Sequence, residues 1–201
     1  MPKIVDSEKK KNEIAHKALY AFAFDGFHRA TMGQIAHMCG IGRSTIYEYF
    51  RNKDEIFTYS LEESLDLIAL DVDQVLKQPE LGCLDRIEEV FRRALSQFAQ
   101  EKRVLLLLFE HALRIIRENQ EVAAALEGRI RTIRGMFESL LEQGIQSGEI
   151  RGDPGCPSAR QVALVLEALL MALAFRFSSD SGASFDDALA GVRELLEGLR
   201  R

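Results

Sequence analysis

Residues 31–53 constrain the fold of this chain more than any other stretch, because they predict two short helices joined by a tight turn. Thr31 stands where the first helix should begin, and Gln34 occupies the position from which a side chain completes a capping box. Ile35 is apolar and should face inward. Gly40 lies at the expected turn, where the missing Cβ makes a positive φ inexpensive. The pattern is typical of a helix-turn-helix.

The second of these helices has one apolar side and one side of polar and aromatic residues. Ile41 and Ile46 supply the buried side, and the other side carries Arg43, Ser44, Thr45, Tyr47 and Glu48. Short side chains let a helix approach base edges in the major groove, where an arginine can donate to guanine or to phosphate. Tyrosine hydroxyls can reach the phosphates. An ordinary helical hairpin with a solvated polar face would share the turn pattern.

A further helix should begin after Asn52, with Glu55 at its capping-box position. Lys53 would lie in its first turn, where a positive charge is unfavourable for the helix dipole. A cation at this position indicates a phosphate partner.

The rest of the chain predicts an all-α protein, since only 4 prolines occur and helix-forming residues dominate. We expect helices over residues 7–24, 53–77, 83–100, 104–116, 119–147, 158–178 and 185–200, with a loop at 148–157. Residues 104–116 are apolar nearly all round, which predicts that they are buried. Residues 158–178 carry two apolar stripes, namely Val162, Val165, Leu169, Leu173 and Leu164, Ala168, Met171, Phe175. Such a helix needs two partners: the body of the chain and either a second subunit or further core.

Charge is distributed unevenly along the chain, whose net charge is −5. Residues 1–55 hold 9 Lys/Arg and 7 Asp/Glu, whereas the remainder holds 17 basic and 24 acidic residues. A mildly basic head and an acidic body would orient the molecule on a duplex.

The cysteines and the lack of an evident targeting signal indicate which kinds of site and which cellular location to expect. The three cysteines, Cys39, Cys83 and Cys156, lack metal-ligand spacing and imply no disulfide framework. We therefore predict no metal and no cofactor, with Cys39 either a small core residue or a redox sensor. No signal peptide and no apolar run of spanning length stand out, so we expect a cytoplasmic protein without membrane contact.

The amino-terminal third of the chain resembles the TetR family of one-component transcriptional regulators. The matching residues are Gly26, Ile35-Ala36, Gly40-Ile41, Thr45-Ile46-Tyr47-Glu48-Tyr49-Phe50 and Asn52-Lys53-Asp54-Glu55-Ile56. The specific motif covers about residues 10–57, and beyond it the resemblance lies in length and helical layout only. Gly42 stands where the family usually has a Ser or Thr cap, and Ser44 where glycine is common.

The resemblance implies a three-helix helix-turn-helix DNA-binding domain at residues 1–52 and a six-helix ligand-binding and dimerisation domain at residues 53–201. It implies a homodimer paired through the last two helices that binds a palindromic operator, by default as a repressor. We expect seven residues to contact DNA: Thr31, Arg43, Ser44, Thr45, Tyr47, Tyr49 and Lys53. Arg43 and Thr45 are the expected base readers, whereas Tyr47, Tyr49, Thr31 and Lys53 are the expected phosphate contacts.

In the family a small molecule binds inside the body and releases the operator. The candidate wall residues here are Leu65, Ile68, Leu105, Phe109, Met136, Phe137, Leu140, Met171 and Phe175, each of which could equally be core packing. These side chains favour a largely apolar or aromatic effector. His111, Glu110 and Arg114 are the polar groups of the same region.

Three other functions compete with this interpretation. An enzyme is disfavoured, because no catalytic Ser/His/Asp set, phosphate-binding glycine loop or His-Glu metal motif appears. A constitutive architectural DNA-binding protein would bind DNA without a ligand response. A helical module independent of DNA would show no salt-dependent binding to any duplex.

Overall fold

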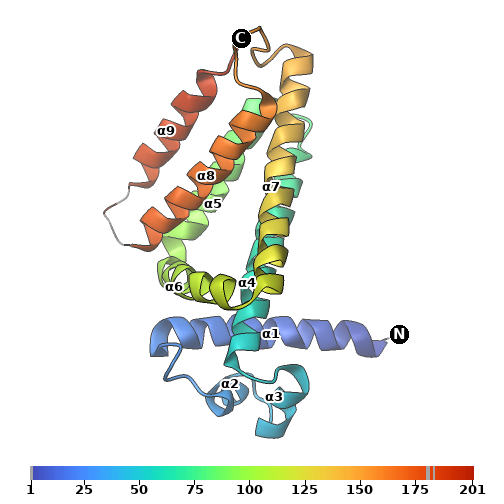
Figure 1. Ribbon diagram of the computed structural model, residues 1–201, viewed down its shortest axis with the longest axis vertical. Helices are drawn as coiled ribbons and strands as arrows, with labels where there is room; N and C mark the ends of the chain where they lie inside the picture. Colours follow the sequence, from blue (N-terminus) through green and yellow to red (C-terminus); the bar gives the residue numbers. More distant parts are fainter. Residues whose placement is uncertain (1, 180–181, 183) are drawn as a thin grey trace. The chain divides into compact units, whose positions relative to one another are not determined.

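The computed structural model describes residues 2–179, 182 and 184–201, with side chains from residue 7 onward (Figure 1). Over these residues the regular structure is helical, and the one β-type pairing is a bridge between Ile150 and Arg200. The helices are α1 (Pro2–Asp25), α2 (Met32–Met38), α3 (Arg43–Tyr49), α4 (Lys53–Leu76), α5 (Cys83–Gln100), α6 (Lys102–Glu118), α7 (Gln120–Ser147), α8 (Ala159–Ser178) and α9 (Phe185–Glu197). The predicted all-α fold class is confirmed.

Two helix starts follow from local capping chemistry. Asn52 Oδ1 accepts a hydrogen bond of 2.8 Å from Glu55 N at the start of α4. Ser158 Oγ accepts from Gln161 N over 3.3 Å, and Gln161 Oε1 accepts in return from Ser158 N over 2.9 Å, which forms a capping box before α8. The predicted loop at residues 148–157 therefore ends where this box begins.

The chain divides into two compact units. The first comprises Met1–Ser64 and Leu106–Ala125, and the second comprises Leu65–Leu105 and Leu126–Arg201. α1, α2, α3, the first half of α4 and most of α6 belong to the first unit. The predicted boundary between a DNA-binding domain at residues 1–52 and a ligand-binding domain at residues 53–201 is a functional division, whereas these units are defined by contacts. The functional boundary stays a prediction.

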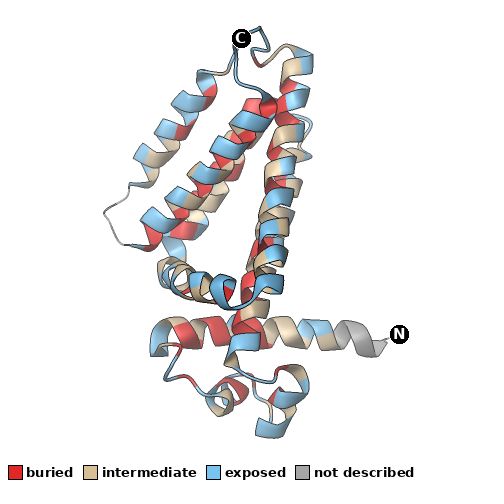
Figure 2. Cartoon of the chain, viewed as in Figure 1, coloured by how far each residue is buried: buried red, intermediate tan, exposed pale blue. Residues whose placement is uncertain are grey.

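Aromatic residues fill the core of the first unit. Phe22 and Phe57 are 1% and 0% exposed, and the Phe27 ring lies 4.9 Å from Phe22 and 5.8 Å from Phe57 between centroids. α2 and α3 each carry buried positions (Figure 2), and these include Ile35 and Ile46, which are both fully buried. Burial of this kind contributes roughly 1.5–3 kcal/mol for each large side chain.

In the second unit α5 packs against both α8 and α9, and the three helices lie side by side (Figure 1). Phe91 of α5 stacks on Phe137 of α7 with centroids 6.3 Å apart, and both rings are fully buried. Val192 and Leu196 are the buried residues of α9. The apolar face of α5 therefore contacts helices from two distant parts of the sequence.

The prediction that residues 104–116 are buried is wrong. In α6 only Leu107 and Ile115 are buried, whereas Leu113 is 68% exposed and Leu106 and Ile116 are 39% and 43% exposed. Leu107 and Ile115 are eight residues apart, so they lie on roughly the same side of α6, and this is its buried side. An apolar composition on several sides does not reveal which side meets the core.

The two stripes predicted for α8 do not match its buried side either. Besides Ser178, its buried residues are the apolar Ala159, Ala163, Leu166, Leu170, Ala174 and Phe177. Alanine at three of these six positions allows a close approach of α8 to its neighbours, which the larger residues of the predicted stripes would not. Leu164, Val165 and Phe175 remain 50%, 60% and 54% exposed.

The expectation that no apolar run reaches spanning length also needs correction. By length and composition α8 could cross a membrane, since an 18-residue window has a mean hydropathy of 1.7. A third of that window, 33%, is buried inside the chain. Core helices of soluble proteins reach similar values, so composition alone does not decide the environment of α8.

Candidate DNA-binding surface and ligand-binding residues

The start of α2 is a complete capping box, as predicted. Thr31 Oγ1 accepts from Gln34 N over 3.2 Å, while Gln34 Oε1 accepts from Thr31 N over 2.8 Å and from the Thr31 hydroxyl over 2.9 Å. Thr31 itself is exposed. Its hydroxyl must therefore leave Gln34 before it can donate to a phosphate.

The turn between α2 and α3 also has the predicted geometry. Gly40 has φ +65°, the left-handed region that favours glycine. Gly40 N donates to His37 O and Ile41 N donates to Ala36 O, both over 3.0 Å, which is the pattern of a Schellman motif. This motif ends α2 abruptly and sets the direction in which α3 leaves.

α3 is a short helix with one buried and one exposed side. Gly42 is its N-cap and supplies no side-chain cap. Ile46 is the buried residue, and Arg43, Ser44, Tyr47 and Glu48 are exposed, with Thr45 and Tyr49 half-buried. Of the predicted contact residues of α3, Arg43, Ser44 and Tyr47 are thus fully available on the surface, whereas Thr45 and Tyr49 are only partly so.

Arg43 lies against α2. A Cβ on Gly33 would come within 2.9 Å of Arg43 Nε, so the guanidinium side chain rests on the bare backbone of Gly33. A hollow of about 530 Å³ at this place is lined by Arg43, Thr31 and Gln34 among others. The structure thus places two predicted contact residues, Thr31 and Arg43, on one concave surface.

Lys53 has an internal partner that the sequence did not reveal. Its Nζ donates to Phe27 O over 2.7 Å and to His28 O over 3.2 Å, and it lies 5.0 Å from the centroid of the Phe27 ring. These carbonyls explain why a cation is accepted in the first turn of α4, without a phosphate. The ammonium has a third N–H, so the predicted DNA contact stays a prediction.

Part of the positive charge on α1 is compensated within the unit. Lys10 and Lys17 contact the two Glu13 oxygens over 2.7 and 2.9 Å. Hydrogen bonds from Lys10 and then Lys17 lower the pKa of the Glu13 carboxyl to about 2. These lysines therefore contribute less to a basic surface than their number suggests.

The helix-turn-helix is similar in sequence to that of known regulatory proteins. Residues 14–59 match the family model described as bacterial regulatory proteins, tetR family. The uncharacterised HTH-type transcriptional regulator YhgD of Bacillus subtilis (strain 168) is 27% identical over 187 residues, or 92% of this chain and 93% of that protein. Residues 14–59 belong to the tetR family of bacterial regulatory proteins.

Other relatives of this chain include the fatty acid metabolism regulator protein of Bacillus subtilis (strain 168), which is 24% identical over 76% of this chain and 77% of the relative. Among solved structures, reduced NemR of E. coli has a TM-score of 0.75 at 17% identity, covering 96% of this chain and 97% of that chain. FadR of Bacillus subtilis in complex with stearoyl-CoA has a TM-score of 0.72 at 22% identity, covering 92% and 96%. The structural similarities establish the fold.

α6 contributes contacts to the first unit that sequence reasoning missed. Arg114 Nη2 contacts Asp54 Oδ1 of α4 over 2.5 Å. The His111 ring lies 4.6 Å from Phe27 and 5.3 Å from Phe57, and its Nδ1 is buried without a hydrogen-bond partner. Burial, followed by the charge of Arg114, lowers the pKa of His111. No local pattern in the sequence points to these contacts.

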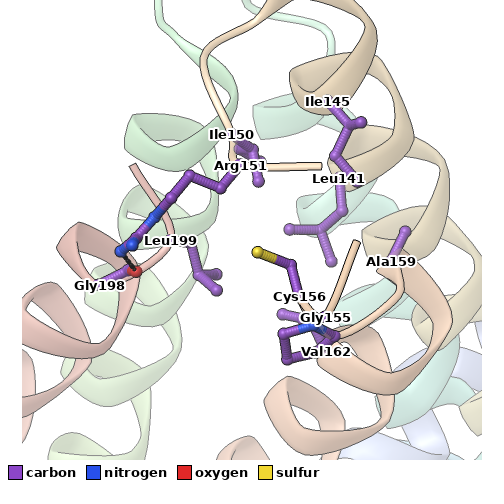
Figure 3. Close-up of a pocket in the computed structure, with 11 residues that line it drawn as sticks. Leu141, Ile145, Ile150, Arg151, Gly155, Cys156, Ala159, Val162, Gly198 and Leu199 are labelled. Carbon is purple, nitrogen blue, oxygen red and sulfur yellow. Dashed lines mark hydrogen bonds between the residues drawn. The ribbon is translucent and has the colours of Figure 1, made fainter. Parts of the chain in front are cut away.

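The nine predicted ligand contacts differ in burial and do not all belong to the same unit. Leu65, Phe137 and Leu140 are buried, and Ile68, Leu105, Met136 and Met171 are half-buried in the second unit. Phe109 belongs to the first unit, and Phe175 is 54% exposed on the outer side of α8. None of the nine lines the cavity of about 200 Å³ found in the second unit (Figure 3). Over the residues that the structure describes, no group of three His, Cys, Asp or Glu could hold a metal ion.

Proposed function

We propose that this protein is a ligand-responsive transcriptional repressor that binds a palindromic operator as a homodimer in the cytoplasm, and that a small, largely apolar effector releases it. The observation that carries the proposal is the exposed polar side of α3, held by the capping box of Thr31 and the turn at Gly40. A helix so presented can enter a major groove.

The DNA contacts proposed are Thr31, Arg43, Ser44, Thr45, Tyr47, Tyr49 and Lys53. A single short helix makes too few contacts to be specific in a genome, whereas two helices about 35 Å apart read successive major grooves. Arg43→Ala should weaken binding to cognate DNA by about 1–3 kcal/mol. Arg131→Ala is the matched control, because Arg131 is an exposed arginine of α7 that pairs with Glu127 of the same helix. Equal affinity of the Arg43 variant and the parent would contradict the assignment.

An exposed apolar stripe on α8 supports the homodimer. Leu164, Val165 and Phe175 are 50%, 60% and 54% exposed, with exposed alanines at 168 and 172 between them. Leu195 on α9 is 57% exposed. Contiguous apolar surface of this kind marks interaction sites. A twofold pairing of α8 and α9 with a second copy would cover both helices.

The dimer is tested by sedimentation equilibrium. Val165→Asp should shift the protein toward the monomer, since a charge would be buried at the interface. Leu67→Asp is the matched control, because Leu67 of α4 is also 60% exposed but lies off the stripe. A parent chain that is monomeric at micromolar concentration would refute this part of the proposal.

The names of two relatives guide the choice of effector. One is a fatty acid metabolism regulator, and one solved structure is a FadR in complex with stearoyl-CoA. We therefore propose long-chain acyl-CoA as the first effector to test. Leu65, Ile68, Leu105, Phe109, Met136, Phe137, Leu140, Met171 and Phe175 stay the proposed contacts of its apolar part.

The effector is tested by fluorescence anisotropy on labelled DNA from upstream of the gene, titrated with stearoyl-CoA. Allosteric coupling of about 1–3 kcal/mol would weaken operator binding roughly 5–150-fold. Free CoA, which lacks the acyl chain, is the control. Operator binding that resists every apolar ligand tried would favour the constitutive, architectural alternative.

A further inference from the structure

A cavity of about 200 Å³ lies in the second unit, away from the proposed effector contacts (Figure 3). It forms where the end of α7, the segment between α7 and α8, the start of α8 and the last residues of the chain meet. Its aliphatic walls are Leu141, Ile145, Ile150, Val162 and Leu199. No proposed function of the protein accounts for this space.

Backbone hydrogen bonds hold the far wall in place. Arg151 N donates to Leu199 O over 3.0 Å, and Arg201 N donates to Glu149 O over 3.1 Å. These two bonds tie the last residues of the chain to the segment that follows α7. The wall is therefore part of the folded structure and does not depend on a side chain that could swing away.

Two glycines keep the isoleucines from filling the cavity. A Cβ on Gly144 would lie 2.5 Å from Ile150 Cδ1, and a Cβ on Gly152 would lie 2.6 Å from Ile145 Cγ2. Both isoleucines are packed on bare backbone, and each would lose that contact if it turned into the cavity. Collapse of the cavity is opposed by this packing.

Among the described residues that line the cavity, the one charged side chain, that of Arg151, is hydrogen-bonded to a backbone carbonyl. The Arg151 guanidinium donates to Gly198 O, and Figure 3 shows it directed toward that carbonyl. The Cys156 thiol points among the aliphatic side chains. A site with these walls suits an uncharged molecule, because the aliphatic side chains cannot replace the hydration of a charged one and the guanidinium is directed toward Gly198 O.

The volume limits the size of the ligand. Drug-sized ligands occupy pockets of roughly 300–1,000 Å³, whereas an apolar cavity of roughly 150 Å³ accepts benzene. We infer that the cavity is a second small-molecule site, which binds a neutral apolar compound with a single ring. The site is independent of the operator and of the effector proposed above.

Cys156 reports on occupancy of this site. It is the exposed cysteine, whereas Cys39 and Cys83 are buried and burial raises the pKa of both thiols. Iodoacetamide should therefore alkylate Cys156 first, as followed by intact mass. Toluene as the probe should slow this reaction about fivefold at about four times its dissociation constant.

Two variants and one second probe make the test specific. Ala159→Leu adds side-chain volume to the cavity wall and should abolish protection by toluene, whereas Ala99→Leu, at an exposed position of α5, should keep it. Val162→Leu replaces Ala159→Leu if circular dichroism shows that the latter does not fold. Unchanged alkylation of the parent up to the solubility limit of toluene would overturn the site. Equal protection by benzoate would overturn the neutral class of ligand.

Discussion

The amino-terminal end of α5 is stabilised by a residue far away in the sequence. Gly82, its N-cap, has no side chain to accept from the first N–H groups of the helix. Glu149 supplies both acceptors instead: Oε2 accepts from Cys83 N over 2.7 Å and Oε1 from Leu84 N over 2.9 Å. Replacement of Glu149 should therefore destabilise the second unit.

The magnitude follows from the two bonds. Hydrogen bonds to a charged group contribute about 1.5–3 kcal/mol net, and loss of an N-cap typically costs about 0.5–2 kcal/mol. These contributions describe the same interaction and do not add, so Glu149→Ala should lower the free energy of unfolding by about 2–3 kcal/mol. For a chain of this length the melting temperature should fall by about 4–12 °C.

The effect should depend on pH in a defined direction. Burial alone would raise the pKa of Glu149, but the hydrogen bonds from Leu84 N and Cys83 N, helped by Arg200, outweigh it and lower the pKa in the folded state. A lowered folded pKa means that the stabilisation is complete above the unfolded value of about 4.3 and is lost as pH falls below it. The difference between parent and Glu149→Gln should therefore be largest at neutral pH.

Urea unfolding followed by circular dichroism at pH 7 and at pH 4 measures both effects. Glu142→Gln is the control, because Glu142 is an exposed glutamate of α7. Two results would refute the reasoning. One is a Glu149→Gln midpoint equal to that of the parent at pH 7, and the other is a deficit as large at pH 4 as at pH 7.

Three further predictions concern single residues. Gly144→Ala should destabilise the protein by about 1–3 kcal/mol in thermal melts, because its Cβ would lie 2.5 Å from Ile150 Cδ1; an unchanged melting temperature would contradict this. Lys53→Ala should lower thermal stability, through its lost carbonyl contacts, and flatten the log–log salt dependence of operator binding by about one unit. A salt slope equal to that of the parent would assign Lys53 a purely structural role. Gly33→Ala should weaken operator binding by displacing Arg43 while the fold is kept, because the displaced atoms are the far end of a flexible side chain; parent affinity would show that the observed position of Arg43 is not needed.

The helix-turn-helix could be predicted from sequence because its partners are local. Thr31 and Gln34 are three residues apart, and the hydrogen bonds of the turn at Gly40 span no more than five residues. Residues so close have few alternative partners. The residue types therefore largely determined the geometry, and α4 begins where the cap at Asn52 predicts.

Burial in α6 and α8 could not be predicted in the same way, because both helices are apolar on several sides. In α8 the buried side is the one that carries Ala163 and Ala174, whereas the larger Val165 and Phe175 stay exposed. α8 packs against α5, and the side with small alanine side chains is the one that allows the closer approach. Hydrophobic periodicity contains no information about such a neighbour.

The roles of Lys53 and Glu149 could not be predicted from the sequence, because their partners are remote. Each satisfies backbone groups of a segment that is remote in sequence, 26 residues away for Lys53 and 66 for the bond from Cys83 N. The charge of Lys53 in the first turn of α4 predicts an external ligand, whereas no local pattern marks Glu149 as the cap of α5. Because buried backbone groups must be paired somewhere, an uncapped helix start such as that of α5 indicates a distant partner. Gly42 of α3 is another N-cap without a side chain, and it is exposed. The first N–H groups of the proposed recognition helix are therefore capped by no side chain of their own N-cap residue, which is consistent with a helix start that meets phosphate when the protein binds DNA.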